Sequence, residues 1–288
     1  MQNKLSEALN YIEGHLDQSL TVQAISEQVG VSAFHFHRLF KLHFGLNLYD
    51  MIRGLRLKRA AYQLAYRQDK VIEIALNAQY QSPEAFSRAF FKVFKQTPSE
   101  FRKAADWSYW QTHHNPALLK RRLNSPVQND YQVEFVHRQN IKIAYLSHQT
   151  NMRELGQTLQ AFIQWRKGRA LGPTKSRTFN LIYADAITGD DYRFDMACEF
   201  PYADLSEFDR ESGIRVSHIP AGEFVKIRHI GSDDELANMA QFLYQYCMAD
   251  KHLKLAHFPL FVERLRFFPD VPECESMSDI YLAIERTL

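Results

Sequence analysis

The chain has 288 residues, of which 45% are hydrophobic and 24% are charged. That length predicts two domains, and that composition excludes a chain that is disordered throughout. No apolar run approaches the roughly 18 residues of a membrane helix, and the N-terminal segment lacks the apolar core of a signal peptide. The three cysteines are widely spaced, which predicts neither a disulfide framework nor a zinc ribbon. We therefore expect a cytoplasmic protein that uses no metal and no cofactor and binds no membrane.

Charge is divided unevenly along the chain. Residues 1–126 contain 17 Lys and Arg against 10 Asp and Glu, whereas residues 127–288 contain 18 against 23. A basic half joined to an acidic half favours nucleic-acid binding by the basic half. A charged face that is simply solvated gives the same pattern, so the charge needs support from motifs.

Up to about residue 105 the sequence predicts helices only, about seven of them, because apolar residues recur at i, i+3, i+4 and i+7. Gly30 and Gly45 stand where turns are needed. Helix N-caps are expected at Thr21, Ser32, Ser82 and Thr97.

Two segments, residues 21–45 and 71–94, have the pattern of helix-turn-helix units. The caps of their second helices, Ser32 and Ser82, are 50 residues apart, and an arginine stands six positions after each cap. One such pattern is often only a helical hairpin, but two with matching caps and arginines favour DNA binding. The inward positions are expected to be Phe36, Leu39, Phe40 and Phe44 in one unit and Phe86, Ala89, Phe90 and Phe94 in the other.

A helix over residues 48–66 is expected between the two units. Its length would be roughly 28 Å at about 1.5 Å per residue, and successive major grooves on one DNA face lie roughly 34 Å apart. One rigid helix can therefore hold two recognition helices in adjacent grooves. Its basic residues are expected to reach phosphates: Arg53, Arg56, Lys58 and Arg59.

After residue 131 the period changes, and strand-like runs surround two helical stretches, residues 152–167 and 233–248. The order repeats at an offset of 81 residues, which predicts two β-α-β-β units. Such a unit cannot bury its sheet face alone, so the two should pack about a pseudo-two-fold with a ligand groove between them. Duplication for stability alone is the alternative. The matches include His148 with His229, Trp165 with Tyr246, and residues 179–185 with 260–266.

Two stretches of the basic half carry a family pattern. MIRGLRLKRAAYQL is similar to the long central helix, and IEIALNAQYQSPEAFSRAFFKVFKQTPSEFR to the C-terminal signature, of the DNA-binding domain of the AraC/XylS family of bacterial transcription regulators. The resemblance covers the first 105 residues and implies that double-stranded DNA is bound by two recognition helices in adjacent major grooves. We also expect RNA polymerase as a partner. The signature residues present are Ile74, Ala75, Tyr80, Ser82, Phe86, Arg88, Phe90, Thr97, Pro98, Phe101 and Arg102.

By resemblance, the outer faces of the two recognition helices contact DNA. The first set is Ala33, Phe34, His37, Arg38 and Lys41, and the second is Glu84, Ser87, Arg88 and Lys92.

The chain departs from the AraC/XylS pattern at several positions. The family often has Gly at Gln79 and Lys95, which predicts either turns with less left-handed backbone or local strain. Pro83 and Glu84 stand where some relatives place polar DNA contacts. Glu84 either accepts a hydrogen bond from cytosine N4 or repels phosphate, so the preference at the second half-site is open.

The acidic half carries a second family pattern in IPAGEFVKIRHIGSDDEL and HFPLFVERLRFFPDVPECESMSDIYLAIE. These stretches resemble the gyrase-inhibitor-like (GyrI-like) effector-binding domain. The resemblance implies a carboxylate at the base of an aromatic-lined groove, which attracts lipophilic cations by charge and by cation–π contact. Glu263 is displaced by one position from the commonest pattern, which turns it to the other strand face unless a bulge intervenes. The candidate effector residues are Trp165, Tyr183, Phe194, Tyr246, Phe261 and Glu263.

The sequence thus predicts a multidomain fold. An all-α double helix-turn-helix domain is expected at residues 1–106, a linker at 107–130, and an α+β effector-binding domain of two β-α-β-β repeats at 131–288. The predicted function is sequence-specific regulation of transcription, modulated by a small molecule for which an amphipathic cation is one candidate.

Several alternatives remain open at this level. A monomer can occupy two grooves, so monomer and dimer both fit. The effector either changes DNA affinity through the linker or changes the recruitment of polymerase. The GxSxG, HExxH and phosphate-loop motifs are missing, which ranks a hydrolase with a buried Glu below a regulator. A helical adaptor that binds protein is the third alternative.

Overall fold

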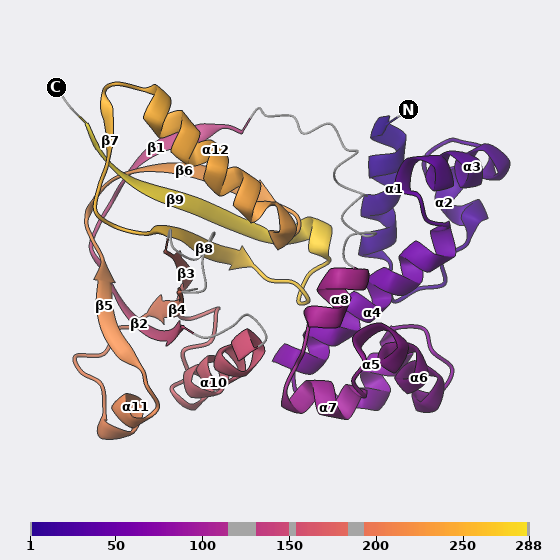
Figure 1. Cartoon of the computed structure of the whole chain (residues 1–288), viewed down its shortest axis with the longest axis horizontal. Coiled ribbons are helices and arrows are strands. Elements are labelled where there is room, and N and C mark those ends of the chain that lie inside the picture. Colours follow the sequence, from indigo (N-terminus) through magenta and orange to yellow (C-terminus); the bar gives the residue numbers. More distant parts are fainter. Residues whose placement is uncertain (1, 115–130, 150–153, 184–192, 287–288) are drawn as a thin grey trace. The chain divides into compact units, whose positions relative to one another are not determined.

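The computed structural model describes residues 2–114, 131–149, 154–183 and 193–286. The chain divides into a helical unit, residues 1–129 with Phe268–Cys274, and a sheet unit, residues 130–267 with 275–288 (Figure 1). Within the described ranges, no helix has the length and apolar character needed to cross a membrane. Most of the predicted linker, residues 115–130, lies outside the described residues, so its boundaries stay a prediction.

The helical unit contains all seven helices predicted up to residue 105, and α4 spans the 19 residues expected. Trp110, in an eighth helix, is buried in the same core, so packing continues past residue 106. The helices are α1 (Gln2–Gly14), α2 (Val22–Gln28), α3 (Ala33–Phe44), α4 (Leu48–Tyr66), α5 (Val71–Asn77), α6 (Pro83–Phe94), α7 (Pro98–Lys103) and α8 (Ser108–His113).

Polar caps begin these helices at most of the predicted positions. The hydroxyls of Thr21 and Ser82 accept hydrogen bonds from backbone N–H groups three residues on, at 3.1 and 3.2 Å. Thr97 forms a capping box with Glu100. Ser32 has the extended backbone of an N-cap, but its side chain makes no cap hydrogen bond, so the cap predicted there is realised by the backbone alone.

Phenylalanines spaced four residues apart fill the core of the helical unit. The six inward phenylalanines are each at most 1% exposed, which confirms the predicted inward faces at these positions. Leu39 is only half-buried and lines a surface pocket, so its predicted inward position was wrong. The six are Phe36, Phe40 and Phe44 on α3, and Phe86, Phe90 and Phe94 on α6.

The turns of the helix-turn-helix units keep a left-handed backbone even where glycine is missing. Gln79 has φ 63° and Lys95 has φ 58°, close to Gly30 at 62° and Gly45 at 73°. Of the two alternatives that the sequence left, the structure therefore supports local strain rather than a less left-handed turn. A side chain in this region costs free energy because its Cβ crowds the backbone.

A short segment distant in sequence completes the helical unit. Phe268–Cys274 is assigned to it, and Glu273 in this segment accepts a hydrogen bond from Nζ of Lys58 at 2.8 Å. The ring of Phe268 lies edge-on to Tyr62, with centroids 4.8 Å apart. Lys58 is thus buried in an ion pair on α4, so the expectation that it reaches DNA phosphates was wrong.

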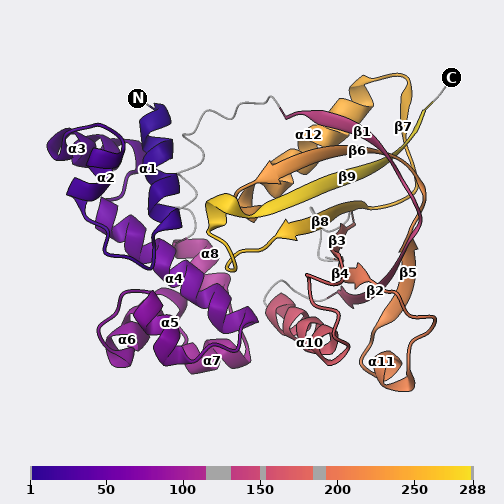
Figure 2. The same ribbon diagram turned by 180° about the vertical axis from the view of Figure 1, so that it is seen from behind.

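The sheet unit is built on one antiparallel sheet whose described strands run β1-β6-β9-β8-β3-β4-β2-β5, with β7 also paired to β9 (Figure 2). The strand-like runs at residues 179–185 and 260–266 fall on β3 and β8 as far as the structure describes them. The strands are β1 (Val133–Arg138), β2 (Ile141–His148), β3 (Thr178–Ile182), β4 (Phe194–Glu199), β5 (Arg215–Ile219), β6 (Gly222–Ile230), β7 (Leu253–Leu255), β8 (Leu260–Arg266) and β9 (Met277–Arg286). The helices are α10 (Leu155–Gly168), α11 (Glu207–Glu211) and α12 (Leu236–Ala249).

The predicted duplication is present as β2-α10-β3-β4 and β6-α12-β8-β9, with the short strand β7 inserted between α12 and β8 in the second repeat. The two helices are each 14 residues long and begin 81 residues apart. Each repeat is preceded by one further strand, and these strands are exchanged, because β1 pairs with β6 and β5 pairs with β2. The β-α-β-β repeat that the sequence predicted is therefore part of a longer β-β-α-β-β unit.

The two faces of the sheet differ in what covers them. On the face that we call the helix face, Val262 packs in the α12 cluster and Met196 in the α10 cluster. Figure 1 shows α12 lying across β6 and β9. The other face, which we call the opposite face, gathers Phe179, Phe261 and Tyr281 in a third cluster built mainly from strand residues.

The equivalent strands β3 and β8 are related by a slightly different offset than the helices α10 and α12, because they begin at Thr178 and Leu260. Phe179 and Phe261 share the opposite face, whereas Leu260 packs in the α12 cluster of the helix face. Phe179 therefore corresponds to Phe261, and the alignment of residues 179–185 with 260–266 was out by one. A one-residue shift on a strand exchanges its two faces, so this matters for the site.

Candidate DNA interface and effector site

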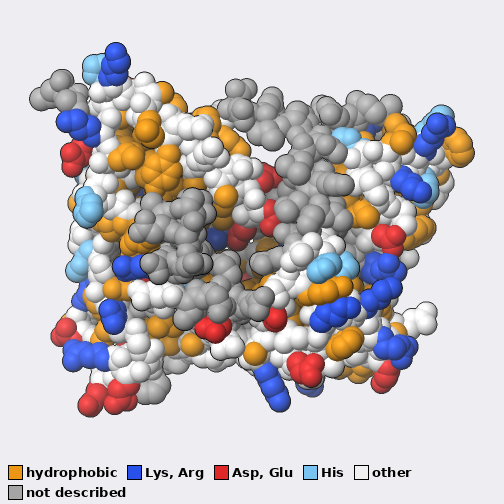
Figure 3. Space-filling model, viewed as in Figure 1, with side chains coloured by type: hydrophobic (Ala, Val, Ile, Leu, Met, Phe, Trp, Pro, Cys, Tyr) orange, Lys and Arg blue, Asp and Glu red, His pale blue; other side chains and the backbone are white. Residues whose placement is uncertain are grey.

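The predicted DNA-contacting residues of α3 lie mainly at the surface. Phe34 is 73% exposed, His37, Arg38 and Lys41 are exposed, and Ala33 is half-buried. They lie on the side of α3 that is turned away from its buried phenylalanines. Figure 3 shows Lys and Arg side chains spread over the visible face of the helical unit.

The α6 set has the same arrangement. Glu84, Arg88 and Lys92 are exposed and Ser87 is half-buried. Hydrogen bonds from its own backbone N–H and from the Ser82 hydroxyl, with the nearby charge of Arg88, hold the pKa of Glu84 below its ordinary value. Glu84 is therefore a carboxylate at neutral pH, able to accept hydrogen bonds from a base and to repel a phosphate.

Most of the basic residues of α4 stabilise the helical unit through hydrogen bonds or an ion pair. Arg56 donates from Nε to the carbonyl of Leu16 at 2.8 Å, and Arg59 donates to the carbonyl of Asn77 at 3.0 Å. Arg53 has a side chain 63% exposed and pairs with Asp50 on the same helix. Among the four basic residues predicted to contact phosphate, Arg53 keeps that possibility, whereas Arg56 and Arg59 hold neighbouring loops together.

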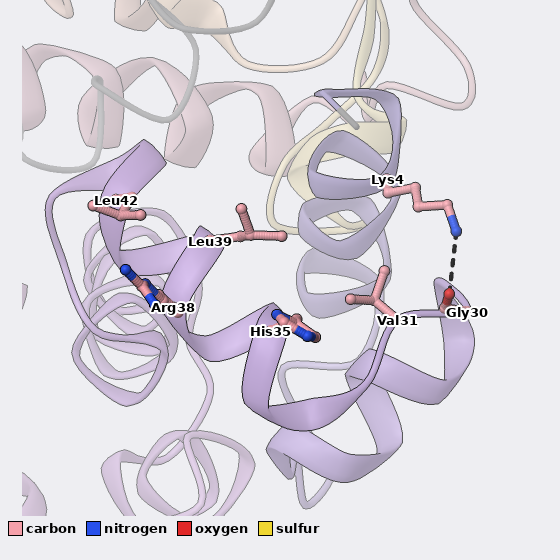
Figure 4. Close-up of a pocket in the computed structure, with 7 residues that line it drawn as sticks. All are labelled: Lys4, Gly30, Val31, His35, Arg38, Leu39 and Leu42. Carbon is pink, nitrogen blue, oxygen red and sulfur yellow. Dashed lines mark hydrogen bonds between the residues drawn. The ribbon is translucent and has the colours of Figure 1, made fainter.

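A pocket of about 560 Å³ lies beside the first recognition helix. Figure 4 shows Lys4 of α1 reaching the Gly30 carbonyl, a hydrogen bond of 3.1 Å that ties α1 to the turn of the first unit. Arg38, a predicted base contact, also lines this pocket. The full lining is Lys4, Gly30, Val31, His35, Arg38, Leu39 and Leu42.

In the sheet unit, Phe261 and Glu263 share the opposite face. Phe261 pairs with Tyr281 and Glu263 with Asp279 in unbroken register, and the irregularity between β8 and β9 begins only after Arg264. The side chain of Glu263 therefore lies on the same face as the stacked rings of Phe261 and Tyr281, whose centroids are 4.8 Å apart. Burial raises the pKa of Tyr281 well above its ordinary value.

Glu263 is bound by an arginine from a different strand. Nη1 of Arg138 donates to Oε2 of Glu263 at 2.7 Å, and the two side chains are 11% and 8% exposed. The guanidinium carbon of Arg138 lies 4.4 Å from the ring centroid of Tyr281 and 5.8 Å from that of Phe261. A carboxylate, two aromatic rings and a cation thus meet on the opposite face.

Tyr183 belongs to a second polar cluster on this face. Its hydroxyl donates to Oδ2 of Asp195 at 2.7 Å, and the guanidinium of Arg193 lies over its ring at 4.0 Å. Burial, with the hydrogen bond and charge of Asp195, raises the pKa of Tyr183 well above its ordinary value. Tyr183 therefore stays protonated and positions Asp195.

The other three effector candidates lie on the helix face. Trp165 donates from Nε1 to Asp209 at 2.7 Å within the α10 cluster, where Phe194 also packs. Tyr246 packs in the α12 cluster. The structure thus brings Phe261 and Glu263 together and keeps Trp165, Phe194 and Tyr246 away from them, because α10 and α12 cover one side of the sheet only.

The comparisons with known proteins match both units. Residues 25–104 match the model of a helix-turn-helix domain family, and residues 131–285, more than half of the chain, match that of the GyrI-like small molecule binding domain. The chain belongs to the AraC-type regulators with a GyrI-like domain.

Three curated relatives support the N-terminal assignment. The chain is 37% identical to the transposon Tn10 TetD protein of Escherichia coli, over 38% of this chain and 79% of that protein. It is 32% identical to the regulatory protein SoxS of Escherichia coli, over 35% of this chain and 94% of SoxS. It is 36% identical to the transcriptional regulator Rob of Salmonella typhimurium over 36% of each protein, so the match spans about a third of Rob.

Sequence reasoning missed Arg138, Asp195 and Tyr281 of the GyrI-like domain. Tyr281 stands in the motif Ser278-Asp279-Ile280-Tyr281, but its pairing with Phe261 depends on the strand register. Arg138 shares its alternate row with Val136, which packs on the opposite face, and this parity was the available signal.

Proposed function

We propose that this AraC-type regulator binds two half-sites on double-stranded DNA, with α3 and α6 in adjacent major grooves. The observation that carries the proposal is the repetition of one exposed arginine and one buried phenylalanine row 50 residues apart, on helices joined by α4. The length of α4, roughly 28 Å at about 1.5 Å per residue, suits that spacing. A monomer is then sufficient for binding, and RNA polymerase is the proposed protein partner.

The DNA contacts proposed are those exposed on the two helices. On α3 they include His37, Arg38 and Lys41, and on α6 Arg88 and Lys92, with Glu84 as an acceptor. Arginine binds guanine O6 and N7 with two hydrogen bonds, which makes Arg38 and Arg88 the side chains of greatest expected specificity.

We also propose that a small molecule, of the amphipathic cation class, binds on the opposite face beside Phe261, Tyr281 and Glu263 and modulates transcription. A buried carboxylate next to stacked aromatic rings supports this ligand class, because such a site stabilises positive charge by both Coulomb attraction and cation–π contact. The regulator is proposed to act without catalysis, in line with relatives named as regulators.

The test of DNA binding is selection of duplexes from a random pool by the purified full chain, followed by sequencing. Two enriched blocks about one helical turn apart are expected, and in Arg38→Ala only the block contacted by α3 should lose its preference. Arg210→Ala, an exposed arginine of α11, is the matched control. Enrichment of no sequence would overturn the proposal, and a single block unaffected by Arg88→Ala would remove α6 from base recognition.

A further inference from the structure

Arg138 occupies the position that a cationic ligand of the opposite face would take. Its guanidinium donates to the buried carboxylate of Glu263 and lies over the ring of Tyr281 at 4.4 Å. These are the two interactions, ion pair and cation–π, by which such a site would hold a guanidinium or ammonium group from solution. The side chain is only 11% exposed, so the position is filled by the chain itself.

The other carboxylates of this face are also paired with cations of the same chain. Asp279 accepts two hydrogen bonds from Arg228, at 2.7 and 2.8 Å, and Asp195 pairs with Arg193 at 3.1 Å. A free cation that approached Glu263 while Arg138 remained would meet a like charge within a few ångströms and gain little. Binding beside Glu263 therefore requires exchange of one cation for another.

We propose that Arg138 is an internal ligand of the effector site, and that a cationic effector binds beside Glu263 by displacing the Arg138 guanidinium. This inference rests on the effector site proposed above. Arg138 then sets specificity, because only a cation that can replace its hydrogen bond to Glu263 and its contact with Tyr281 competes with it.

Displacement of Arg138 would act on β1. This strand lies at one end of the described sheet and pairs with β6 alone, and Arg138 is its last residue, paired with Gly222. The contact with Glu263 fastens the end of β1 to β8, two strands beyond β6. Along the chain, β1 directly follows the predicted linker to the DNA-binding domain. An effector that occupies the site therefore removes the contact between β1 and β8, and β1 is the strand to which the linker is joined.

The test uses methylguanidinium, which matches the head group of arginine, and isothermal titration calorimetry on the full chain. Arg138→Ala should bind it with at least roughly tenfold higher affinity than the unaltered chain, the scale of one charge-assisted hydrogen bond that no longer has to be exchanged. In Arg138→Ala with Glu263→Gln the gain should vanish. Arg286→Ala is the matched control, because Arg286 also lies over a phenylalanine ring, 4.9 Å from the centroid of Phe135, but pairs with Glu223 at 3.6 Å.

Equal affinity in Arg138→Ala and the unaltered chain, or a gain that survives Glu263→Gln, would overturn the proposal. Should Arg138→Ala not fold, Arg138→Gln removes the charge while it keeps most of the stem, and the same comparison decides. Amide hydrogen exchange gives an independent readout. The amides of β1 should exchange faster in Arg138→Ala than in the unaltered chain, and methylguanidinium should not change their rate in this variant. The amides of β5, the equivalent end strand, should exchange at the same rate in both chains. Unaltered exchange in β1 would also count against the proposal.

Operator binding by the same variants separates this inference from the proposed function. Suppose that Arg138→Ala gains methylguanidinium binding but that the ligand changes neither operator affinity nor transcription in vitro. Arg138 is then an internal ligand, and the proposal that the effector controls transcription is rejected. If no gain occurs while the unaltered chain responds to a cation through Glu263, effector control stands and the role of Arg138 falls.

Discussion

Nζ of Lys58 lies 2.8 Å from Oε1 of Glu273, a residue 215 positions further along the chain. Both side chains are buried, at 5% and 8% exposure, and both belong to the helical unit. A basic residue in the middle of α4 is thereby used to hold Phe268–Cys274 against the helix that joins the two helix-turn-helix units. Burial of one partner without the other would leave an uncompensated charge in a place where water cannot solvate it.

Removal of one partner should therefore destabilise the helical unit strongly. We expect Lys58→Met or Glu273→Leu to lower the free energy of unfolding by about 3–5 kcal/mol, and the double variant to recover most of that loss. Urea unfolding of the full chain at neutral pH, followed by circular dichroism, measures this. The exposed pair Arg53 with Asp50 is the control, because Arg53→Ala should cost less than about 1 kcal/mol. Equal effects at Lys58 and Arg53 would contradict the buried ion pair.

The sequence predicted what depends on local periodicity. The seven helices and the phenylalanine rows follow from the 3.6-residue period, and the repeat of the sheet unit followed from its 81-residue offset. Lys58 with Glu273 and Arg138 with Glu263 could not be predicted, because they join residues 215 and 125 positions apart. Glu263 shows the same limit, since the face of a strand residue depends on a register that a one-residue error reverses.

Position 95 should favour glycine for stability, because Lys95 has a left-handed backbone, φ 58°, in which a side chain costs free energy. Lys95→Gly and Lys95→Ala both remove the contact of Nζ with the ring of Tyr109, at 4.6 Å. The two variants differ in the Cβ alone, so Lys95→Gly should be more stable than Lys95→Ala by about 1 kcal/mol. Thermal unfolding of the two variants checks the difference. Equal stabilities would mean that the turn relaxes when the side chain is shortened.

Asp209 should make the sheet unit sensitive to acid. Burial by itself would raise its pKa, but hydrogen bonds from Trp165, Ser206 and Arg169 outweigh burial and hold the pKa far below its ordinary value. A carboxyl whose pKa is lower in the folded state stabilises the fold at pH values above its pKa in the unfolded state, which is near 4. This stabilisation is lost as the pH falls toward and through the pKa of the folded state.

The destabilisation caused by Asp209→Asn should therefore be largest at neutral pH and shrink as the pH falls below about 4. Urea midpoints of both chains between pH 7 and pH 3 measure it. Glu207→Gln, at an exposed position of the same helix, is the control and should give a small difference at every pH. A destabilisation by Asp209→Asn that does not change with pH would show that packing, rather than charge, is what the substitution removes.

Arg38 and Arg53 should differ in the kind of DNA binding they support. Arg38 is exposed on α3, and its loss in Arg38→Ala should weaken binding to the selected site by about 1–3 kcal/mol while binding to unrelated DNA changes little. Arg53 lies on α4, so Arg53→Ala should weaken binding to both DNAs alike. It should also reduce the slope of log affinity against log salt by about 0.9, the effect of one lost phosphate contact. Fluorescence anisotropy over a salt series with both DNAs measures the two effects together. If Arg38→Ala lowers affinity for both DNAs equally and changes the salt slope, Arg38 contacts phosphate and base recognition by α3 must come from its neighbours Phe34 and His37.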